Sequence, residues 1–261
     1  MPDELWELFQ RVAPKAPSRP QGGGRRRHGD REGLAAIVFV ATSGCPWQQL
    51  PAASFGPSGV TAHRRFRRVD EGQVVGQAPP LGPRRARRPR RAGLVPLRDR
   101  LGEHAGPETG ELTGPNPADR GKYSPKIHLI TERTGLPVSA AIPGANLHDS
   151  QALIPLVKGI PPIRSRRGRR RRRPAKLHAN KGYDYDHLRR WSKERGIRHR
   201  IARKGVESST RLGRHRWTAE RTMPRLTGCR RPHRRYERKA EHFLAFTSIA
   251  CTLTCYHRLT K

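Results

Sequence analysis

The sequence predicts an α/β protein in which a domain with a mixed sheet follows a small helical domain. Three observations support this fold class. Apolar residues recur at helical spacing within residues 1–66. Residues 126–142 hold two runs of strand-forming residues around a Glu-Arg-Thr-Gly turn, which is the pattern of a β-hairpin. Helical and strand patterns alternate after this hairpin, as they do in a mixed sheet covered by helices.

The composition indicates a polyanionic partner. Lys and Arg number 55 against 21 Asp and Glu, which gives a formal net charge of +34, and such a field attracts nucleic acid most strongly. No apolar run approaches the roughly 20 residues that span a bilayer. The residues from Met1 to Trp6 are acidic and mixed, unlike a signal peptide. We therefore expect a cytoplasmic protein that binds DNA and no membrane.

The cysteines are expected to be reduced structural thiols. Cys45, Cys229, Cys251 and Cys255 lack the paired short spacings of a zinc ribbon and are too few for a disulfide scaffold. Cys251 and Cys255 lie one turn apart in an apolar helical pattern over residues 243–259, which favours packing in a core.

Three helices are expected in the first part of the chain. Apolar spacing predicts a helix over residues 3–13 and a buried helix from Asp30 to the Ser43-Gly44 pair. A basic helix is predicted over residues 60–66. Small helices with a basic last helix fit a unit that docks on DNA. Arg64 and Arg65 are therefore candidates for contacts with DNA.

Residues 67–109 have a different character. Pro, Gly and Arg dominate residues 79–91, and the segment has no hydrophobic period with which to bury a core. We expect a disordered basic linker here. The predicted division is therefore a helical DNA-binding domain over 1–66, the basic segment over 67–109 and a catalytic domain over 110–261.

Regular structure is expected to resume at Gly110. The hairpin is followed by a predicted helix over residues 149–157, for which Asp149 is the expected N-cap. The elements predicted after it are a strand leading into Asn180, a helix over 186–195, a strand over 200–203 and a long helical region from Trp217.

The run from Arg164 to Arg173 predicts an exposed loop. Arg169, Arg170 and Arg171 are candidates for phosphate contacts, because each neutralised phosphate strengthens binding in a salt-dependent way. A solvated tether between two elements is an equally good interpretation.

Glu220 and its basic neighbours are candidates for DNA chemistry. Cutting and joining DNA requires carboxylates that hold two divalent ions, one activating a water or 3′-hydroxyl and the other stabilising the leaving oxygen. Mg²⁺ prefers such hard oxygen ligands. Glu220 lies in a predicted helix with Arg216 and Arg221, which are suited to phosphate. The alternative is a surface Glu that pairs with a neighbouring Arg.

Six short motifs occur in a fixed order along the chain. They are Gly44-Cys45-Pro46-Trp47 with Leu50-Pro51, Gly114-Pro115-Asn116-Pro117 with Asp119-Arg120-Gly121-Lys122, Gly144-Ala145-Asn146 with His148-Asp149-Ser150, Asn180-Lys181-Gly182-Tyr183-Asp184, Glu220-Arg221-Thr222, and Arg234-Arg235-Tyr236-Glu237-Arg238. With these motifs the chain resembles the DDE-type transposases of insertion sequences, specifically the group numbered five. The resemblance covers roughly residues 1–66 and 110–261.

The resemblance implies an RNase H-like catalytic domain, a small helical N-terminal domain for DNA, and Mg²⁺-dependent strand cleavage and transfer. The implied partners are terminal inverted repeats, target DNA and a second copy of the chain in the DNA complex. Carried over by position, the second catalytic and metal-binding carboxylate falls on Asn180 and the third on Glu220. An amide keeps a carbonyl oxygen but lacks the charge that holds a cation. We therefore expect this copy to be catalytically inactive.

The first carboxylate of the family has no match in this chain. The resemblance places it on a strand shortly before Gly110, in an apolar-Asp-Ser context, whereas Asp99 is followed by Arg100, Leu101 and Gly102. These four residues can be encoded by codons that give Ile-Asp-Ser when read from one base later. We hypothesise that residues 67–109 are translated out of frame, which would leave the sheet without its first strand. An authentic basic insertion is the alternative.

The alternative function is that of a non-enzymatic basic nucleic-acid-binding protein. Metal-dependent nicking of terminal-repeat DNA would separate the two functions. The neighbours His148, Asp149 and Ser150 are not expected to form a hydrolase triad, since the groups of a triad converge from separate elements. His128 and His178 are expected to be strand residues near the site, without an assigned role.

Overall fold

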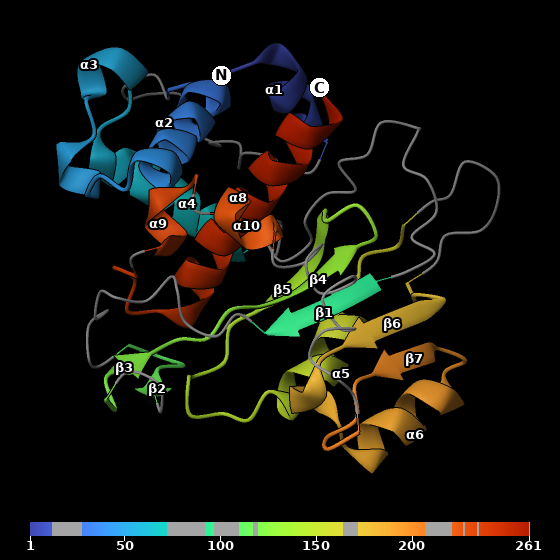
Figure 1. The fold of residues 1–261 in the computed structure, drawn as a ribbon. Helices are drawn as coiled ribbons and strands as arrows, with labels where there is room; N and C mark the ends of the chain where they lie inside the picture. The colour runs from blue at the N-terminus through green and yellow to red at the C-terminus, as the bar shows by residue number, and fades with distance from the viewer. Residues whose placement is uncertain are drawn as a thin grey trace.

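The computed structural model of the chain describes residues 1–11, 28–71, 92–96, 110–116, 120–163, 172–206, 221–226, 228–233 and 235–260. Most helices gather on one side of a sheet, and two helices, α5 (Ser150–Lys158) and α6 (Asp186–Glu194), lie on its other side (Figure 1). The sheet thus separates two layers of helices. Both α5 and α6 confirm helices predicted from the sequence.

A five-stranded mixed sheet, ordered β5-β4-β1-β6-β7, forms the centre of the fold. Its strands are β1 (Ala92–Pro96), β4 (His128–Glu132), β5 (Pro137–Ala141), β6 (Lys176–Ala179) and β7 (Arg198–Ile201). Strand β4 is antiparallel to β5 and β1, whereas β6 is parallel to β1 and β7. The predicted hairpin and the predicted strand before Asn180 are therefore confirmed. The last strand begins at Arg198 rather than at Arg200.

Strand β1 corrects one expectation about the basic segment. The prediction that residues 67–109 form a disordered linker does not hold for Ala92–Pro96, which occupy the centre of the sheet between β4 and β6. The expected loss of the first strand is likewise not observed. The sequence of β1 is unusual for a central strand, because Gly93 weakens a strand and Pro96 has no N–H to donate to the ladder. Asp99 lies outside the described residues.

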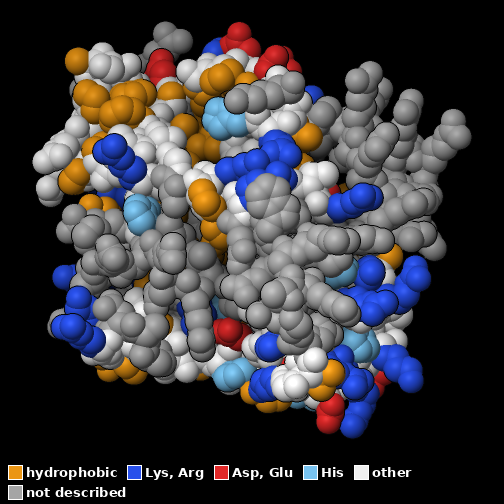
Figure 2. Space-filling model, viewed as in Figure 1, with side chains coloured by type: hydrophobic (Ala, Val, Ile, Leu, Met, Phe, Trp, Pro, Cys, Tyr) orange, Lys and Arg blue, Asp and Glu red, His pale blue; other side chains and the backbone are white. Residues whose placement is uncertain are grey.

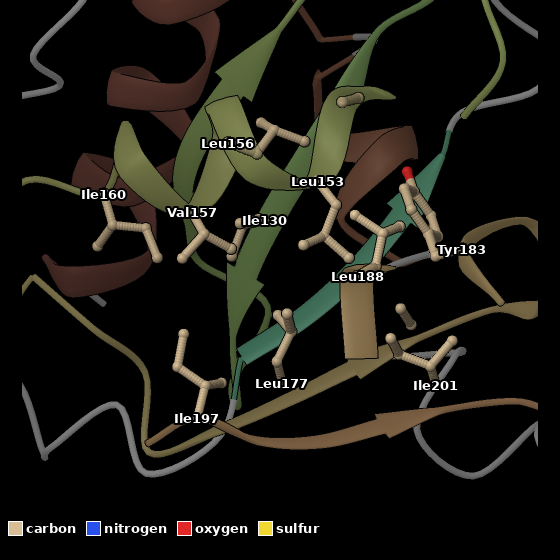
Figure 3. Packing of buried hydrophobic residues seen from close by; sticks show 12 residues of the cluster. Ile130, Leu153, Leu156, Val157, Ile160, Leu177, Tyr183, Leu188, Ile197 and Ile201 are labelled. Atoms are coloured by element: carbon tan, nitrogen blue, oxygen red, sulfur yellow. The ribbon is translucent and has the colours of Figure 1, made fainter. Parts of the chain in front are cut away.

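Helices α5 and α6 cover one face of the sheet. Alternate strand residues point to opposite faces, so Leu177 and Ala179 of β6 and Ile201 of β7 share this face and are buried beneath the helices (Figure 3). The completely or almost completely buried members of this core are Ile130, Leu153, Leu156, Leu177, Tyr183, Leu188 and Ile197. This core holds the ends of β4 and β6 in fixed register beside the start of α5.

Helix α10 (Ala240–Leu259) lies across the other face, over β5 (Figure 1). It packs with α8 (Thr222–Leu226), with α1 (Asp3–Gln10) and with Leu129 of β4 in a second core. The long helical region predicted from Trp217 is therefore divided, with α9 (Arg230–His233) as a separate short helix. Gly228, which lies between α8 and α9, disfavours a continuous helix. Trp217 itself lies outside the described residues.

The N-terminal helices do not form a core of their own. They are α2 (Asp30–Ser43), the 3-10 turn η1 (Trp47–Gln49), α3 (Ala52–Phe55) and α4 (Gly59–Glu71). Their core is completed by Ala245 and Phe246 of α10, and the rings of Phe66 and Phe246 stack with centroids 4.4 Å apart. The expected small helical domain is thus present as helices, but it shares its core with the end of the chain. Gly44 ends α2 in the left-handed conformation, with φ of 75°.

Smaller features complete the structure. Strands β2 (Gly114–Pro115) and β3 (Tyr123–Ser124) form a separate two-stranded ribbon. All four cysteines are free, as predicted, and burial raises the pKa of Cys229 to about 11. Among the described residues, no helix is long and apolar enough to cross a membrane.

Candidate active site at the end of strand β6

Asn180 lies directly after β6, where the strand leaves the sheet. Its backbone is still extended, with φ of −79° and ψ of 180°, and it precedes a single 3-10 turn, η2 (Lys181–Tyr183). The side-chain Oδ1 of Asn180 accepts a hydrogen bond of 3.0 Å from the backbone N–H of Gly182. The amide therefore acts as a cap for this turn, and one lone pair of its oxygen is already occupied.

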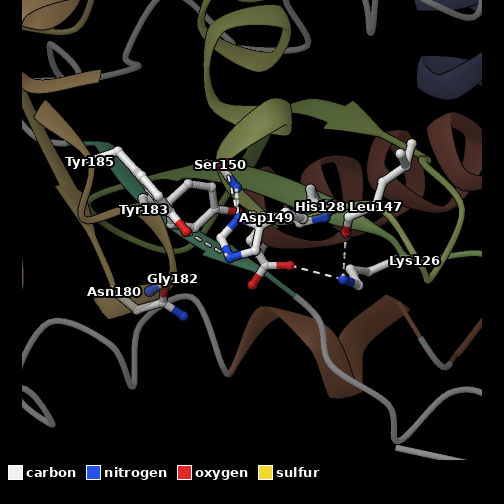
Figure 4. Close-up of polar contacts among 10 residues, drawn as sticks. Lys126, His128, Leu147, Asp149, Ser150, Asn180, Gly182, Tyr183 and Tyr185 are labelled. Carbon is white, nitrogen blue, oxygen red and sulfur yellow. Dashed lines mark hydrogen bonds and ion pairs between the residues drawn. The ribbon is translucent and has the colours of Figure 1, made fainter. Parts of the chain in front are cut away.

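A buried ion pair lies beside this turn. Lys126 Nζ is 2.9 Å from Asp149 Oδ1 and also donates to the carbonyl oxygen of Leu147 at 3.1 Å (Figure 4). The side chains of Lys126 and Asp149 are only 12% and 9% exposed. Asp149 occupies the predicted N-cap position of α5 but makes no capping hydrogen bond. Its carboxylate instead neutralises Lys126.

Gly182 brings Asp149 and Asn180 together. A Cβ atom placed on Gly182 would lie 3.0 Å from Asp149 Oδ2 and 3.1 Å from Asn180 Oδ1, which is closer than ordinary side-chain contacts. Two oxygens from separate elements thus converge on a position that only glycine leaves open. The start of α5 and the end of β6 therefore meet at this point (Figure 4).

Tyr183 and His128 form a buried hydrogen-bonded pair next to Asn180. The Nδ1 atom of His128, on β4, is 2.8 Å from the hydroxyl of Tyr183, and both side chains are fully buried. Burial lowers the pKa of His128 to about 4, with Lys126 acting in the same direction and Asp149 against it. Burial also raises the pKa of Tyr183 well above its usual range. Both groups are therefore neutral at physiological pH, and their hydrogen bond fixes the turn after Asn180 to the sheet.

A chain of hydrogen bonds near Asp149 links Ser150, His148 and Tyr185. His148 Nδ1 is 2.9 Å from Ser150 Oγ, and His148 Nε2 is 3.1 Å from the hydroxyl of Tyr185. The near neighbours His148 and Ser150 thus do contact each other, although Asp149 points to Lys126 instead. No Ser-His-Asp triad exists at this place, because the carboxylate does not meet the imidazole.

Asp184 fastens the loop after β7 to the same region. Its Oδ2 accepts the backbone N–H of Lys204 at 2.8 Å, and its Oδ1 accepts two bonds from the Arg189 guanidinium. The backbone N–H of Lys204 and the guanidinium of Arg189 hold the pKa of Asp184 below its ordinary value. Lys204 Nζ also lies 4.4 Å from the centre of the Tyr185 ring. Asp184 is therefore a structural anion and is not free for metal.

The predicted DNA contacts fall in different environments. Arg64 of α4 is exposed. Arg65 is buried: its guanidinium donates to the backbone carbonyls of His28 and Gly29 and lies 3.6 Å from Asp30. It therefore holds the start of α2, and the expectation that it contacts DNA does not hold. Arg221 donates to the carbonyl of Thr134 at 3.3 Å. The predicted residues Arg169, Arg170, Arg171, Arg216 and Glu220 lie outside the described residues.

The described residues do not fit a divalent cation as they stand. Within the described ranges, no group of three or more His, Cys, Asp and Glu side chains is placed to hold a metal ion. Asn180 supplies a neutral oxygen that already accepts a hydrogen bond, and the nearby carboxylate of Asp149 is neutralised by Lys126. A hard cation requires charged oxygens that are not already paired. Glu220, the other carboxylate expected at the site, lies outside the described residues.

The sequence prediction missed Lys126 and Tyr183. Lys126 directly precedes a buried strand, and a basic residue at that place is an ordinary surface feature in a sequence. Tyr183 belongs to the motif after Asn180, but its burial against His128 depends on contacts between distant strands. Neither residue carried a local signal that would have assigned it a place in the site.

The sequence matches known families over two long stretches. Residues 1–78 match the family described as "Putative transposase of IS4/5 family", and residues 100–255 match the family described as "Transposase DDE domain". The second match covers more than half of the chain. Residues 79–99 lie between the two matches and belong to the basic segment.

Two proteins of Burkholderia cepacia are similar to the chain. One, described as "Putative transposase for insertion sequence element IS402", is 41% identical over 149 residues, which are 57% of this chain and 71% of that protein. The other, described as "Insertion element IS402 uncharacterized 16.2 kDa protein", is 41% identical over 66 residues, which are 25% of this chain and 45% of that protein.

Proposed function

The chain belongs to the DDE-domain transposases of insertion sequences, in the IS4/5 group, and from this membership we propose that its reaction by descent is strand cleavage and transfer at terminal inverted repeats. DDE transposase domains act on DNA with divalent metal ions, and Mg²⁺ is the ion we propose. The family also implies an RNase H-like fold, with which the mixed sheet between helices agrees.

Two residues stand at the proposed catalytic positions. Asn180 takes the place of the second carboxylate and Glu220 that of the third. The position of Asn180 supports this proposal, because it directly follows β6, an inner strand of the sheet, and lies close to the carboxylate of Asp149. Active sites of sheets with parallel strands commonly lie at such carboxyl ends.

The observation that carries our proposal about the present activity is the state of the Asn180 side chain. Its neutral oxygen caps the next turn, and Lys126 neutralises the neighbouring carboxylate. These residues lack the unpaired negative charge that a divalent ion requires. We therefore propose that this copy binds DNA but cuts it poorly or not at all. The same observation favours a second candidate function, that of a basic DNA-binding protein without catalysis.

The remaining proposals concern the organisation of the protein. We propose DNA recognition by the helices of residues 1–66, an ancestral catalytic role for residues 110–261 together with β1, and an out-of-frame origin for residues 67–109. The unusual Gly93 and Pro96 in β1 and the position of residues 79–99 between the two family matches support this origin for residues 79–99. Residues 67–78 and 100–109 fall within the family matches as they stand. We also propose a cytoplasmic location and a homodimer on DNA. Arg64, Arg169, Arg170, Arg171, Arg216 and Arg221 remain the proposed phosphate contacts.

A cleavage assay tests the proposed function. The protein is incubated with Mg²⁺ and a duplex that carries the terminal repeats of its own insertion sequence, and nicked strands are resolved on a denaturing gel. We expect binding without nicking for the chain as it stands. A variant that combines the restored reading frame with Asn180→Asp is expected to nick at the repeat ends, and adding Glu220→Gln is expected to abolish this nicking. Failure of the restored variant to bind repeat DNA would refute the proposal.

A further inference from the structure

Four basic or imidazole side chains occupy one face of the β6–β7 ladder. The register pairs Lys176 with Arg198 and His178 with Arg200. Paired residues of neighbouring strands point to the same face of a sheet. The alternate residues Leu177, Ala179 and Ile201 are buried on the opposite face beneath α5 and α6. We name Lys176, His178, Arg198 and Arg200 the basic ladder.

The basic ladder lies on the face that carries α10. His178 is paired with Gly93 of β1, and Gly93 is paired with Thr131 of β4, so His178 and Thr131 lie on the same face of the sheet. Thr131 shares its face with Leu129, and Leu129 packs in the core built around α10. Helix α10 itself lies over β5, at the far edge of the sheet. At the β7 edge, Arg198 and Arg200 are exposed.

The charged side chains that β6 and β7 contribute are all basic. The Nε2 atom of His178 is buried, so the exposed charge of the ladder lies chiefly on Arg198 and Arg200. Neither β6 nor β7 contains an acidic residue. Neighbouring strands lie about 5 Å apart, and alternate residues along a strand lie about 7 Å apart. The backbone positions of the four ladder residues are therefore close together. Lys and Arg side chains also gather around α6 and β7 in the space-filling view (Figure 2).

The ladder leads to the proposed catalytic position. Asn180 keeps an extended backbone after the strand, so it continues the alternation of Lys176 and His178 on β6. The row of basic residues therefore runs from the β7 edge toward Asn180, one of the two proposed catalytic residues.

We propose that the basic ladder binds the phosphate backbone of the DNA duplex that leads away from the reacting phosphodiester. The DNA backbone is the expected ligand because its phosphates form a regular row of negative charges that complements these basic side chains. Contacts with phosphates position the DNA without reading its sequence. This inference rests on the proposed function, since it assigns a surface to the same DNA substrate.

The test is the salt dependence of DNA binding by the full chain. Binding of a fluorescent random-sequence duplex is measured by anisotropy at several salt concentrations, and log K is plotted against log [salt]. The ladder variant Arg198→Gln/Arg200→Gln is expected to reduce the steepness of this plot by about 1.8, since each lost phosphate contact removes about 0.9. The charge-conserving variant Arg198→Lys/Arg200→Lys is expected to keep the wild-type slope.

A matched control removes equal charge from the opposite side of the sheet. Arg190 and Lys193 are exposed on α6, and the variant Arg190→Gln/Lys193→Gln is expected to change the slope far less than the ladder variant. Equal slopes for the ladder variant and the wild type, or equal losses in ladder and control variants, would overturn the inference while leaving the proposed function intact. Absence of DNA binding by the wild type would overturn both. Unchanged thermal unfolding midpoints show that the variants fold.

Discussion

Lys126 Nζ and Asp149 Oδ1 lie 2.9 Å apart in a nearly buried ion pair that joins the approach to β4 with the start of α5. Asp149 also borders Gly182, in the turn that Asn180 caps. The ion pair therefore fixes the start of α5 relative to β4 and to the turn after Asn180. Because the pair is buried, the loss of one partner leaves a charge that water cannot reach.

Lys126→Met is therefore expected to destabilise the protein by about 3–5 kcal/mol, the usual cost of leaving one member of a buried pair unpaired. The free energy of unfolding is measured by urea denaturation. The double variant Lys126→Met/Asp149→Asn removes both charges and is expected to be more stable than Lys126→Met alone. Equal stability of Lys126→Met and the wild type would show that the pair contributes nothing.

Stability is expected to fall on acidification because of His128. Burial holds the pKa of folded His128 at about 4, below its ordinary value of 6.5, so the unfolded chain binds a proton more readily than the folded chain. The contribution of neutral His128 is full above pH 6.5 and is lost progressively as the pH falls toward 4. The free energy of unfolding is expected to be about 3 kcal/mol lower well below pH 4 than above pH 6.5 because of this one group. Urea denaturation across this range measures it, and His128→Gln is expected to show a weaker pH dependence than the wild type.

Arg231 is expected to be essential for the shared helical core. Its Nε lies 2.6 Å from Glu237 Oε1 with both side chains buried, and it also donates to the carbonyl of Cys45 after α2. Arg231→Met is expected to cost about 3–5 kcal/mol, because Glu237 then stays buried without its partner. The exposed pair of Lys239 and Glu241 supplies the control: Lys239→Met is expected to cost less than about 1 kcal/mol. Similar losses in both variants would contradict this assignment.

The out-of-frame hypothesis predicts a specific nucleotide sequence. Translation of codons 67–109 in the shifted frame is expected to give a strand that carries Ile-Asp-Ser near the position of Asp99. Such a strand would replace the Gly93 and Pro96 of β1, which are poorly suited to a central position. Sequencing of the locus and translation in all forward frames decides the matter. If neither shifted frame encodes the motif, the basic segment is an authentic insertion.

Local patterns in the sequence were sufficient for much of the fold. The hairpin of β4 and β5, the strand before Asn180 and helices α2, α5 and α6 were predictable, because period and turn residues are short-range signals. The order of the strands and the place of β1 at the centre depend on pairing between distant segments. They have no counterpart in local sequence, and a segment rich in Arg and Pro argued against any strand there.

The candidate site was predictable only in part. The motif after β6 indicated Asn180, but the ion pair of Lys126 and Asp149 joins residues that are far apart in the chain and carry no pairing signal. Arg65, in contrast, was assigned to the site by the sequence but does not belong to it. A basic residue on a basic helix is expected at the surface, yet its guanidinium satisfies the carbonyls before α2. The sequence shows the charge of such a residue but not its partner.

The most direct test of the account is the binding of a divalent ion at position 180. Binding of Mn²⁺, as a spectroscopic substitute for Mg²⁺, is followed by electron paramagnetic resonance for the wild type, Asn180→Asp and Asn180→Asp/Glu220→Gln. We predict weak binding by the wild type, tighter binding by Asn180→Asp, and a return to weak binding in the double variant. Tight binding by the wild type, no gain in Asn180→Asp, or equally tight binding by Asn180→Asp and the double variant would contradict the assignment of Asn180 and Glu220 to one metal site.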